Sequence, residues 1–415
     1  KFLLKSPEEP LSNFYIGWKI VFILFFITFY IHGAFILGFT AIFEPIVNEL
    51  GWSYTQISIA ASIRGLEVGL FAPLMGFFVD RYGPKKLLIS GVTLIGMGFI
   101  LLSQVHTLIM FYSIFFLITL GVSAFSGPVT TPAIAGWFKK DFGKALGVMS
   151  CGSGAGGLLL LAIVRFIDLF QWRTTLIILG LGMWIIGIPL TIAFRDHHEK
   201  ENDFADKGVS NTPLSRNNTG SHEIHFKEII KNRTFWQICS AEGIRLTTLT
   251  AVLTHIMPYL SSIGLSRSIA ALVATVTPLM SIIGKLGFGW LSDRFDKRYV
   301  MGIAYLLACL GLTALSYAYI PWFIFPFLIF FPISWTSGVL RGAILREYFG
   351  TKKLGSILGF MAGIYAFARL FGAPIAGWRY DSTGSYYPIW LVFAAGFILS
   401  AALIFTLKPT KRQFT

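Results

Sequence analysis

The stretch GFFVDRYGPKK (residues 76–86) lies between two long apolar runs, and a related stretch, GWLSDRFDKR (residues 289–298), lies between two others. Asp293 in the second stretch follows Asp80 in the first by 213 residues, in a chain of 415 residues. A polar turn that recurs at half the length of a chain indicates two halves built on one plan. The same offset relates two further pairs: Pro45 with Pro258, and Gly51 with Gly264. The first two helices of each half are therefore expected to superpose.

The composition indicates a polytopic membrane protein. Apolar residues make up 55% of the chain, charged residues make up 13%, and the mean hydropathy is +0.69; a soluble domain has about a quarter of its residues charged. The formal net charge of +14 comes from basic residues in short loops between apolar runs, where lipid headgroups attract them. The expected partner is thus a lipid bilayer and not a nucleic acid. The three cysteines lie in apolar runs, and no disulfide, metal site or cofactor is expected.

A membrane-spanning helix needs about 20 largely apolar residues, and the sequence contains twelve such runs. They lie near residues 17–43, 55–79, 87–105, 108–136, 144–167, 173–194, 234–262, 267–291, 299–318, 321–346, 355–378 and 385–407. The predicted fold class is an all-α membrane protein, with twelve transmembrane helices in two pseudo-symmetric six-helix bundles.

One long hydrophilic segment, residues 195–233, separates the sixth run from the seventh. It predicts a cytoplasmic linker between an N-terminal bundle (1–194) and a C-terminal bundle (234–415), with an interfacial helix near its end, at 225–233. Lys and Arg are concentrated in the loops on the same side as this linker. By the positive-inside rule, both termini are expected in the cytoplasm and the protein in a plasma membrane, such as the bacterial inner membrane.

The pattern Gly-x-x-x-Asp-Arg-x-Gly-Pro-Lys-Lys at 76–86 resembles the signature of the major facilitator superfamily, and the likeness extends over nearly the whole chain. Within that superfamily, LREYFG (345–350) and GWRYDSTGSY (377–386) resemble the monocarboxylate transporter and oxalate/formate antiporter branch. The resemblance implies a transporter with a substrate site between the halves near the membrane midplane. It implies no enzyme activity, and no nucleophile-and-base arrangement is visible.

The opening stretch and its copy are interpreted as parts of an inner gate. Acidic and basic residues at a cytoplasmic helix end can pair with neighbouring helices and hold that gate shut. The residues expected to act in gating are Gly76, Asp80, Arg81, Asp293 and Arg294. The run at 152–157, which is rich in glycine, lies inside an apolar span and is interpreted as close helix packing, not as a nucleotide loop.

Ionisable residues inside a span are expensive and suggest function. Arg64 and Glu67 are three residues apart, as are Glu242 and Arg245, so the members of each pair lie on one helical face, where they can neutralise each other. Compensation within the helix and a ligand role are both open. The repeat places His32 opposite Arg245, which makes His32 a candidate proton or substrate site as well as an ordinary hydrogen-bonded histidine.

Three further cations have no acid on their own helix: Lys285, Arg341 and Arg369. They would repel one another unless an anion, or an acid from the other half, lay among them. By the resemblance, Lys285 occupies the position of a substrate-binding arginine, and Arg369 occupies that of a helix-eleven lysine in oxalate transporters. The two would clamp a carboxylate. For Arg341, nearer its cytoplasmic end, binding and structural roles are both open.

The sequence does not single out one residue that would couple proton movement to transport. Animal monocarboxylate transporters place an aspartate four residues before the helix-eight arginine, and Ser281 stands there in this chain. Proton coupling would therefore use Glu67, Glu242, His32 or the carboxyl group of the substrate, and exchange against a counter-anion is also compatible. Hydrogen bonds from Tyr30, Tyr365 and Trp335 to a carboxylate are possible, although each aromatic residue is also a candidate for packing. His255, nearer the outer end of its helix, is interpreted as structural.

The sequence thus predicts a monomeric secondary active transporter that moves a mono- or dicarboxylate by alternating access, as a proton symporter or an anion exchanger. Export of amphipathic drugs is one alternative, and it predicts a large apolar cavity with few cations. A membrane sensor that does not transport is another, and only a flux measurement separates it from a transporter.

Overall fold

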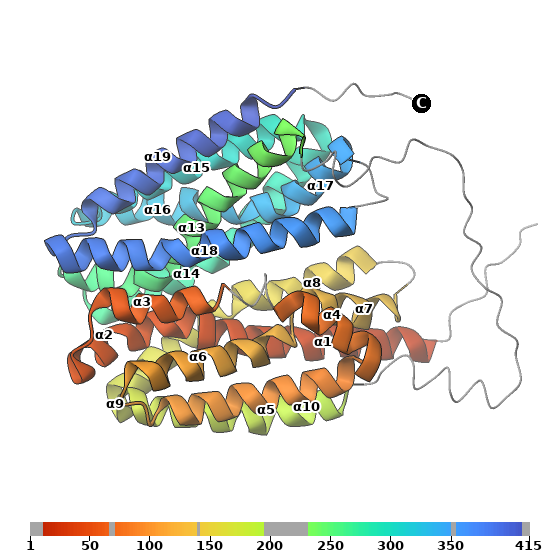
Figure 1. Ribbon diagram of the computed structural model, residues 1–415, viewed down its shortest axis with the longest axis horizontal. Coiled ribbons are helices and arrows are strands. Elements are labelled where there is room, and N and C mark those ends of the chain that lie inside the picture. Colours follow the sequence, from red (N-terminus) through yellow and green to blue (C-terminus); the bar gives the residue numbers. More distant parts are fainter. Residues whose placement is uncertain (1–10, 66–70, 139–141, 195–230, 350–353, 409–415) are drawn as a thin grey trace, which may run out of the picture.

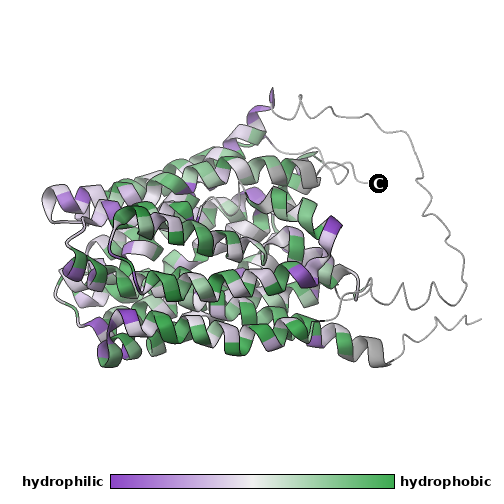
Figure 2. Cartoon of the chain, turned by 60° about the horizontal axis from the view of Figure 1, so that its bottom comes forward, coloured by the Kyte–Doolittle hydropathy of each residue, from purple (hydrophilic) through white to green (hydrophobic). Residues whose placement is uncertain are grey.

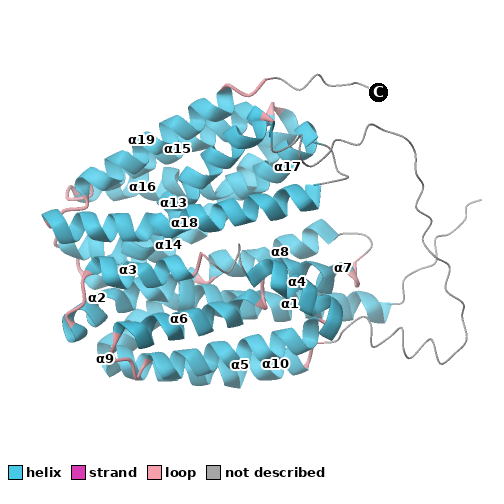
Figure 3. Cartoon of the chain, viewed as in Figure 1, coloured by secondary structure: helices cyan, strands magenta, loops and turns pink. Residues whose placement is uncertain are grey.

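The computed structural model describes residues 11–65, 71–138, 142–194, 231–349 and 354–408. These residues are almost entirely helical, and no strand occurs among them (Figure 3). The N-terminal group of helices comprises α1 (Leu11–Ile31), η1 (His32–Leu37), α2 (Gly38–Leu50), α3 (Tyr54–Ile63), α4 (Ala72–Tyr82), α5 (Pro84–Leu102), α6 (Leu108–Ser123), α7 (Gly127–Ala135), α8 (Phe142–Ala155), α9 (Gly157–Gly182), η3 (Met183–Gly187) and α10 (Ile188–Ile192).

The C-terminal group comprises α13 (Arg233–Ser262), α14 (Arg267–Arg294), α15 (Lys297–Ser316), η4 (Pro321–Phe323), α16 (Ile324–Phe330), η5 (Phe331–Thr336), α17 (Ser337–Phe349), α18 (Leu354–Thr383) and α19 (Tyr387–Phe405). In Figure 1 this group lies above the N-terminal group, and the long helices of both run roughly parallel to the horizontal axis. The expected interfacial helix at 225–233 falls largely outside the described residues.

The described helices account for twelve membrane crossings. Nine stretches within the described part of the chain are long and apolar enough to cross a membrane. One of them, Lys144–Ile192, has 49 residues, more than twice the length that a bilayer core of about 30 Å requires. It is interrupted at Gln171, where φ is 65°, and so provides two crossings. The pair α3 and α4 and the more polar α13 supply the remaining two. The fold class predicted from the sequence is confirmed.

The repeat is visible in the backbone at the junction of the first two helices of each group. Gly51 and Gly264, related by the offset of 213, have φ values of 67° and 87°, in the left-handed region that glycine adopts without a steric penalty. Ser53 and Ser266 have the same offset, and each caps the N-terminus of the following helix through its hydroxyl. The same turn chemistry is therefore used twice, as the sequence predicts.

The outer surface of the bundle is apolar along the length of the helices, and hydrophilic residues gather at its two ends (Figure 2). Large side chains such as Ile185 and Val392 are 72% and 61% exposed. Apolar side chains so exposed on helices of this length are suited to contact with lipid.

The two ends differ in charge. The α4–α5 junction at Gly83 and the α14–α15 junction at Asp296 lie at one end, which we call the basic end because Lys and Arg flank both junctions. The opposite end, which contains the turns at Gly51 and Gly264, is called the far end. The helices α13 and α18 run from the basic end to the far end.

The two groups pack through α3 against α18 and through α9 against α14. Small residues allow this contact: a Cβ on Gly377 of α18 would lie 2.8 Å from Ser58 Oγ, and one on Gly157 of α9 would lie 2.7 Å from the carbonyl oxygen of Thr275. Gly152 and Gly156 approach α1 and η1 equally closely. The interpretation of the glycine run as close packing is confirmed.

Candidate substrate cavity

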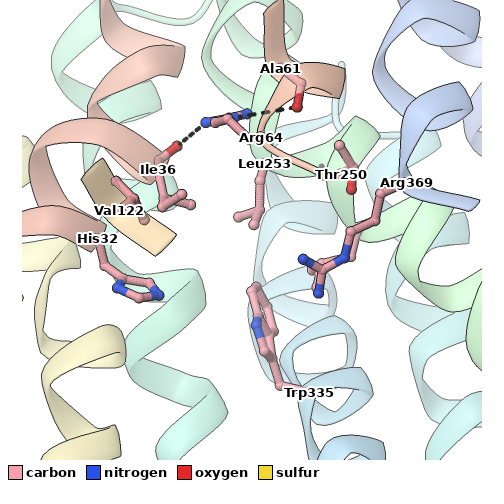
Figure 4. A pocket seen from close by; sticks show the side chains of 11 residues that line it. His32, Ile36, Ala61, Arg64, Val122, Thr250, Leu253, Trp335 and Arg369 are labelled. Carbon is pink, nitrogen blue, oxygen red and sulfur yellow. Dashed lines mark hydrogen bonds between the residues drawn. The ribbon is translucent and has the colours of Figure 1, made fainter. Parts of the chain in front are cut away.

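A cavity of about 300 Å³ lies between the two groups (Figure 4). Its polar lining comes from five helical segments that are distant in the sequence. Its described lining residues are His32, Ile36, Ala61, Arg64, Gly65, Val122, Leu249, Thr250, Leu253, Trp335 and Arg369. Arg369 is near the middle of α18, so the cavity lies at about half the depth of the bundle.

The cavity is cationic on the side of the C-terminal group. Figure 4 shows the guanidinium of Arg369 beside the indole of Trp335, with the ring of His32 across the cavity from them. His32 Nδ1 lies 3.1 Å from the carbonyl oxygen of Thr28. Because a carbonyl can only accept, Nδ1 carries the hydrogen, and Nε2 is the ring nitrogen left for a ligand or a proton. No acidic residue belongs to the described lining.

Arg64 forms the wall of the cavity toward the far end, and an irregular turn holds it there. The segment η1 is a π-helix, and Gly38 N–H bonds to the Gly33 carbonyl, five residues back. Arg64 Nη1 donates to two carbonyl oxygens of this wider turn, Phe35 O at 3.2 Å and Ile36 O at 3.0 Å. Its Nη2 donates across the interface to Thr254 Oγ1 at 3.2 Å.

A buried cluster of charges lies in the C-terminal group, on the basic-end side of the cavity. Arg245 Nη2 is 2.8 Å from Glu242 Oε2, as the three-residue spacing predicts. Two other helices complete the cluster: Tyr305 of α15 donates to Glu242 Oε1 at 2.8 Å, and Arg341 Nη1 of α17 lies 3.5 Å from Glu242 Oε2. Arg341 is therefore not an uncompensated cation, and the sequence analysis was wrong to treat it as one. Its missing acid comes from α13 in the same group.

The Arg341 guanidinium also stacks on an aromatic ring, with its Cζ 5.0 Å from the centroid of Tyr365. Neither Arg341 nor Tyr365 is among the cavity-lining residues, and neither is Arg245. Although the repeat pairs His32 with Arg245, only His32 faces the cavity. The Glu242 carboxylate lies between the guanidiniums of Arg245 and Arg341.

Two of the remaining candidate residues, Lys285 and Tyr30, do not line the cavity. Lys285 is half-buried on α14 and is not among the lining residues; no hydrogen bond or ion pair engages it within the described chain. Tyr30 donates to Leu179 O at 2.7 Å, inside the N-terminal group and away from the cavity. Glu67, the expected partner of Arg64, lies outside the described residues, so that pair stays a prediction.

The two repeated polar stretches, residues 76–86 and 289–298, lie at the basic end. Gly76 is on α4, and Arg81 is exposed, with its Cζ 5.6 Å from the Tyr82 ring. Arg294, at the end of α14, lies 3.9 Å from the ring centroid of Trp290. Asp80 and Asp293 are on helices whose course is described, but their side chains are not.

The second polar stretch, residues 289–298, contains another acidic residue, Asp296, three positions after Asp293. Asp296 caps α15 and accepts hydrogen bonds from the side chain of Arg298 at 3.0 Å and 3.1 Å. These bonds hold the pKa of the Asp296 carboxyl below its usual range. The role of both stretches in gating stays a prediction.

The far end of the cavity is closed by contacts between the two groups. Asp381 of α18 accepts hydrogen bonds from the backbone N–H groups of Tyr54 at 3.0 Å and Thr55 at 2.8 Å, at the first turn of α3, and from the Thr55 hydroxyl. A carboxylate is favoured there because the N-terminus of a helix carries partial positive charge. Further links are Ser58 with His255, Thr40 with Met257, Glu44 with Ser261, and Arg267 with Asp168.

His255 is a structural member of this closure, consistent with the interpretation from sequence. Its ring is fully buried, with Nδ1 2.9 Å from the Tyr386 hydroxyl and Nε2 2.9 Å from both Ala373 O and Ser58 Oγ. The Ser58 hydroxyl donates to Tyr54 O, so it accepts from Nε2. One histidine thus connects α13, α18 and α3.

The contacts of Arg64 and the position of Asp381 were not predicted from the sequence. For Arg64, a pair within its own helix and a ligand role were both open, and the π-helix that receives it has no recognisable sequence signal. Asp381 belongs to the GWRYDSTGSY stretch, which was used only for the family resemblance. Its position at the far end of α18 was the available signal.

Twelve membrane-spanning helices in two related groups, with a polar cavity between them at mid-depth, define a membrane transporter. The sequence matches the family model of the Major Facilitator Superfamily at residues 20–259 and 246–415. The chain belongs to this superfamily. Monocarboxylate transporter 12 of Mus musculus is 28% identical over 439 residues, covering 96% of this chain and 86% of the relative. An MFS-type transporter of Bacillus subtilis (strain 168), YcxA, is 26% identical over 361 residues, with coverage of 82% and 83%.

Solved structures support the fold. The nucleoside transporter NupG superposes with a TM-score of 0.72 at 14% identity, covering 95% of this chain and all of the other. A bacterial homologue of the human lysosomal transporter Spinster gives 0.69 at 14% identity, covering 96% and 97%. The superfamily predicted from the sequence is confirmed, the curated relatives include monocarboxylate transporters, and these relatives are transporters, not enzymes.

Proposed function

We propose that this chain is a secondary active transporter that moves a small organic anion, a mono- or dicarboxylate, by alternating access. The observation that carries the proposal is the cavity at mid-depth, which Arg369 and Arg64 line and to which no described acidic residue contributes. In a cavity with low-dielectric walls, fixed positive charge attracts anions and disfavours cations. The names of the mammalian relatives, monocarboxylate transporters, point to the same class of cargo.

In the cycle that we propose, Arg369 binds the substrate carboxylate, and Lys285 approaches the same anion from α14 as the two groups rock around it. His32, with Nε2 available, is the candidate proton site that faces the cavity. The coupling is either proton symport or exchange for a counter-anion.

The basic end is assigned to the cytoplasm by the positive-inside rule, with both termini there, in a plasma membrane such as the bacterial inner membrane. The bundles are assigned to 1–194 and 234–415, and the working unit to a monomer.

Flux into proteoliposomes tests this function. The purified protein is reconstituted, and uptake of labelled lactate, pyruvate and oxalate is compared with that of lactamide, which has the size of lactate without its charge. Saturable uptake of a carboxylate and none of lactamide is expected. An inward proton gradient drives accumulation if the protein is a symporter, whereas internal carboxylate is required if it is an exchanger. Equal uptake of lactamide, or transport of an amphipathic cation instead, would overturn the proposal.

The far-end contacts act in this cycle as the outer gate, and Asp381→Asn should weaken it. The amide keeps the shape but loses the charge that the first turn of α3 favours. Hydrogen bonds to charged groups contribute about 1.5–3 kcal/mol and less at an exposed site, so we expect roughly a fivefold shift toward molecules open at the far end. Spin labels at exposed Gln104 and Tyr319, one in each group, report this as longer distances in lipid nanodiscs.

Glu49→Gln is the matched control for the gate. Glu49 is also an acid at the far end, but its partners Arg173 and Trp172 belong to the same group of helices. This variant should leave the distances between labels unchanged. Identical distance distributions in Asp381→Asn and the parent protein would show that the carboxylate does not hold the two groups together.

A further inference from the structure

Among the buried polar atoms of the C-terminal group that have no hydrogen-bond partner within the described residues, two lie close together on the basic-end side of the cavity: the Tyr365 hydroxyl and Arg341 Nε. Tyr365 is four residues before Arg369 on α18, so it lies one turn nearer to the basic end, on the same helical face. Its side chain is 3% exposed. Within the described residues, its hydroxyl makes no hydrogen bond, and neither does the buried Nε of Arg341. Buried donors of this kind are normally satisfied.

The two groups are neighbours in a positive environment. Arg341 Cζ lies 5.0 Å from the ring centroid of Tyr365. Among the described residues of the cluster, Glu242 is the one acid, and its Oε2 faces both Arg245 at 2.8 Å and Arg341 at 3.5 Å. Its Oε1 accepts from Tyr305. One carboxylate is thus shared by two guanidiniums, and the described members of the cluster carry an excess of positive charge.

The chemistry of these atoms selects the missing partner. The Nε–H of arginine can only donate, and the Tyr365 hydroxyl, which makes no hydrogen bond within the described residues, is available as a donor. A ligand that satisfies both must offer acceptors, and the excess positive charge favours an anion. A carboxylate meets these conditions, whereas a cation or an apolar molecule does not. Arg341 is also the less tightly held of the two arginines, with 23% of its side chain exposed against 5% for Arg245.

We propose that Arg341 Nε and Tyr365 Oη form a second carboxylate subsite, one helical turn from Arg369 toward the basic end. The proposal rests on the proposed function and adds an order of events to it. A carboxylate leaving Arg369 moves about 5.4 Å along α18 and meets a second guanidinium, so it is not released directly into the apolar interior. Arg341 then exchanges its loose contact with Glu242 for one with the substrate.

The variant Tyr365→Phe isolates the subsite, because it keeps the ring beneath Arg341 and removes only the unpartnered hydroxyl. If Tyr365 served packing alone, losing a buried hydroxyl without a partner would be neutral or stabilising and would not change ligand affinity. A binding role predicts an unchanged or higher melting temperature together with weaker binding. We expect the apparent Kd for oxalate or lactate, titrated by tryptophan fluorescence, to rise about tenfold, and efflux from proteoliposomes to slow.

Tyr259→Phe provides the matched control. Tyr259 is also 3% exposed, but its hydroxyl donates to Leu315 O at 2.5 Å, near the far end. This variant should lower the melting temperature and leave the Kd unchanged, the reverse of Tyr365→Phe. Arg341→Lys keeps the charge but loses the Nε donor, and its Kd should rise as in Tyr365→Phe.

Failure of the subsite and failure of the proposed function give different results. If the parent protein binds oxalate or lactate and both Tyr365→Phe and Arg341→Lys keep its Kd and efflux rate, the subsite does not exist, while the function stands. If the parent protein binds no carboxylate at all, the function fails, and the subsite fails with it.

Discussion

Replacing Glu242 with glutamine should destabilise the protein more than any other single change at the charged residues described above. The carboxylate is fully buried and compensates Arg245, which is 4% exposed, as well as Arg341. Removing one partner of a buried ion pair leaves an uncompensated charge and typically costs about 3–5 kcal/mol. Glu242→Gln is expected to accumulate poorly and to unfold at a much lower temperature in detergent.

The double variant Glu242→Gln, Arg245→Gln keeps this prediction testable if the single variant cannot be purified. It removes one charge of each sign, so it should recover much of the lost thermal stability. A stable Glu242→Gln protein that still exchanges substrate would contradict the prediction. That result would restore Glu242 as the proton-coupling residue that the sequence suggested, because glutamine mimics a protonated glutamate.

Replacing Arg369 with glutamine should abolish carboxylate uptake while leaving a folded protein. Arg369 lines the cavity, and its guanidinium lies beside Trp335 (Figure 4). Truncating one partner of a buried charge pair costs about 2–5 kcal/mol, equivalent to a loss of affinity of roughly 30-fold to several thousandfold. The half-saturation concentration for oxalate counterflow measures it, and Arg369→Lys should retain part of the affinity.

Two further variants separate site chemistry from total charge. Arg379→Gln removes the same charge from the far end of the same helix and should transport normally. Lys285→Gln tests whether Lys285 and Arg369 clamp one carboxylate. If Lys285 approaches the bound anion, the affinity of this variant for the carboxylate should fall nearly as far as that of Arg369→Gln. Uptake that survives neutralisation of Arg369 would refute the assignment of this cavity as the carboxylate site.

Local patterns predicted much of the architecture. The offset of 213 identified two related groups because turn chemistry is local: Gly51 and Gly264 adopt positive φ, and Ser53 and Ser266 cap the next helix. The ion pair of Glu242 with Arg245 also followed from spacing on one helix. Interactions within a single turn or helix can be read directly from a sequence.

Contacts between helices could not be obtained in this way. Arg341 finds its acid on α13, and Tyr305 reaches the same carboxylate from α15; neither pairing has a fixed spacing in the sequence. The depth of a residue along its helix was also insufficient to place it in the cavity, because rotation about the helix axis decides which side chains face inward. Lys285 and Arg369 lie on two such helices, yet only Arg369 is among the residues lining the cavity.

The capping of α3 has a consequence for how the outer gate opens. Ser53 and Gln56 form a reciprocal capping box at the start of α3, in which the Ser53 side chain accepts from Gln56 N–H and the Gln56 side chain accepts from Ser53 N–H. When Asp381 withdraws, its three donors, the N–H groups of Tyr54 and Thr55 and the Thr55 hydroxyl, turn to water, and they lie at an exposed end of the bundle. In the proposed cycle, we therefore expect the helix to part from α18 without fraying. Opening is then a rigid-body separation that can be reversed each time, not a local unfolding that must be repaired.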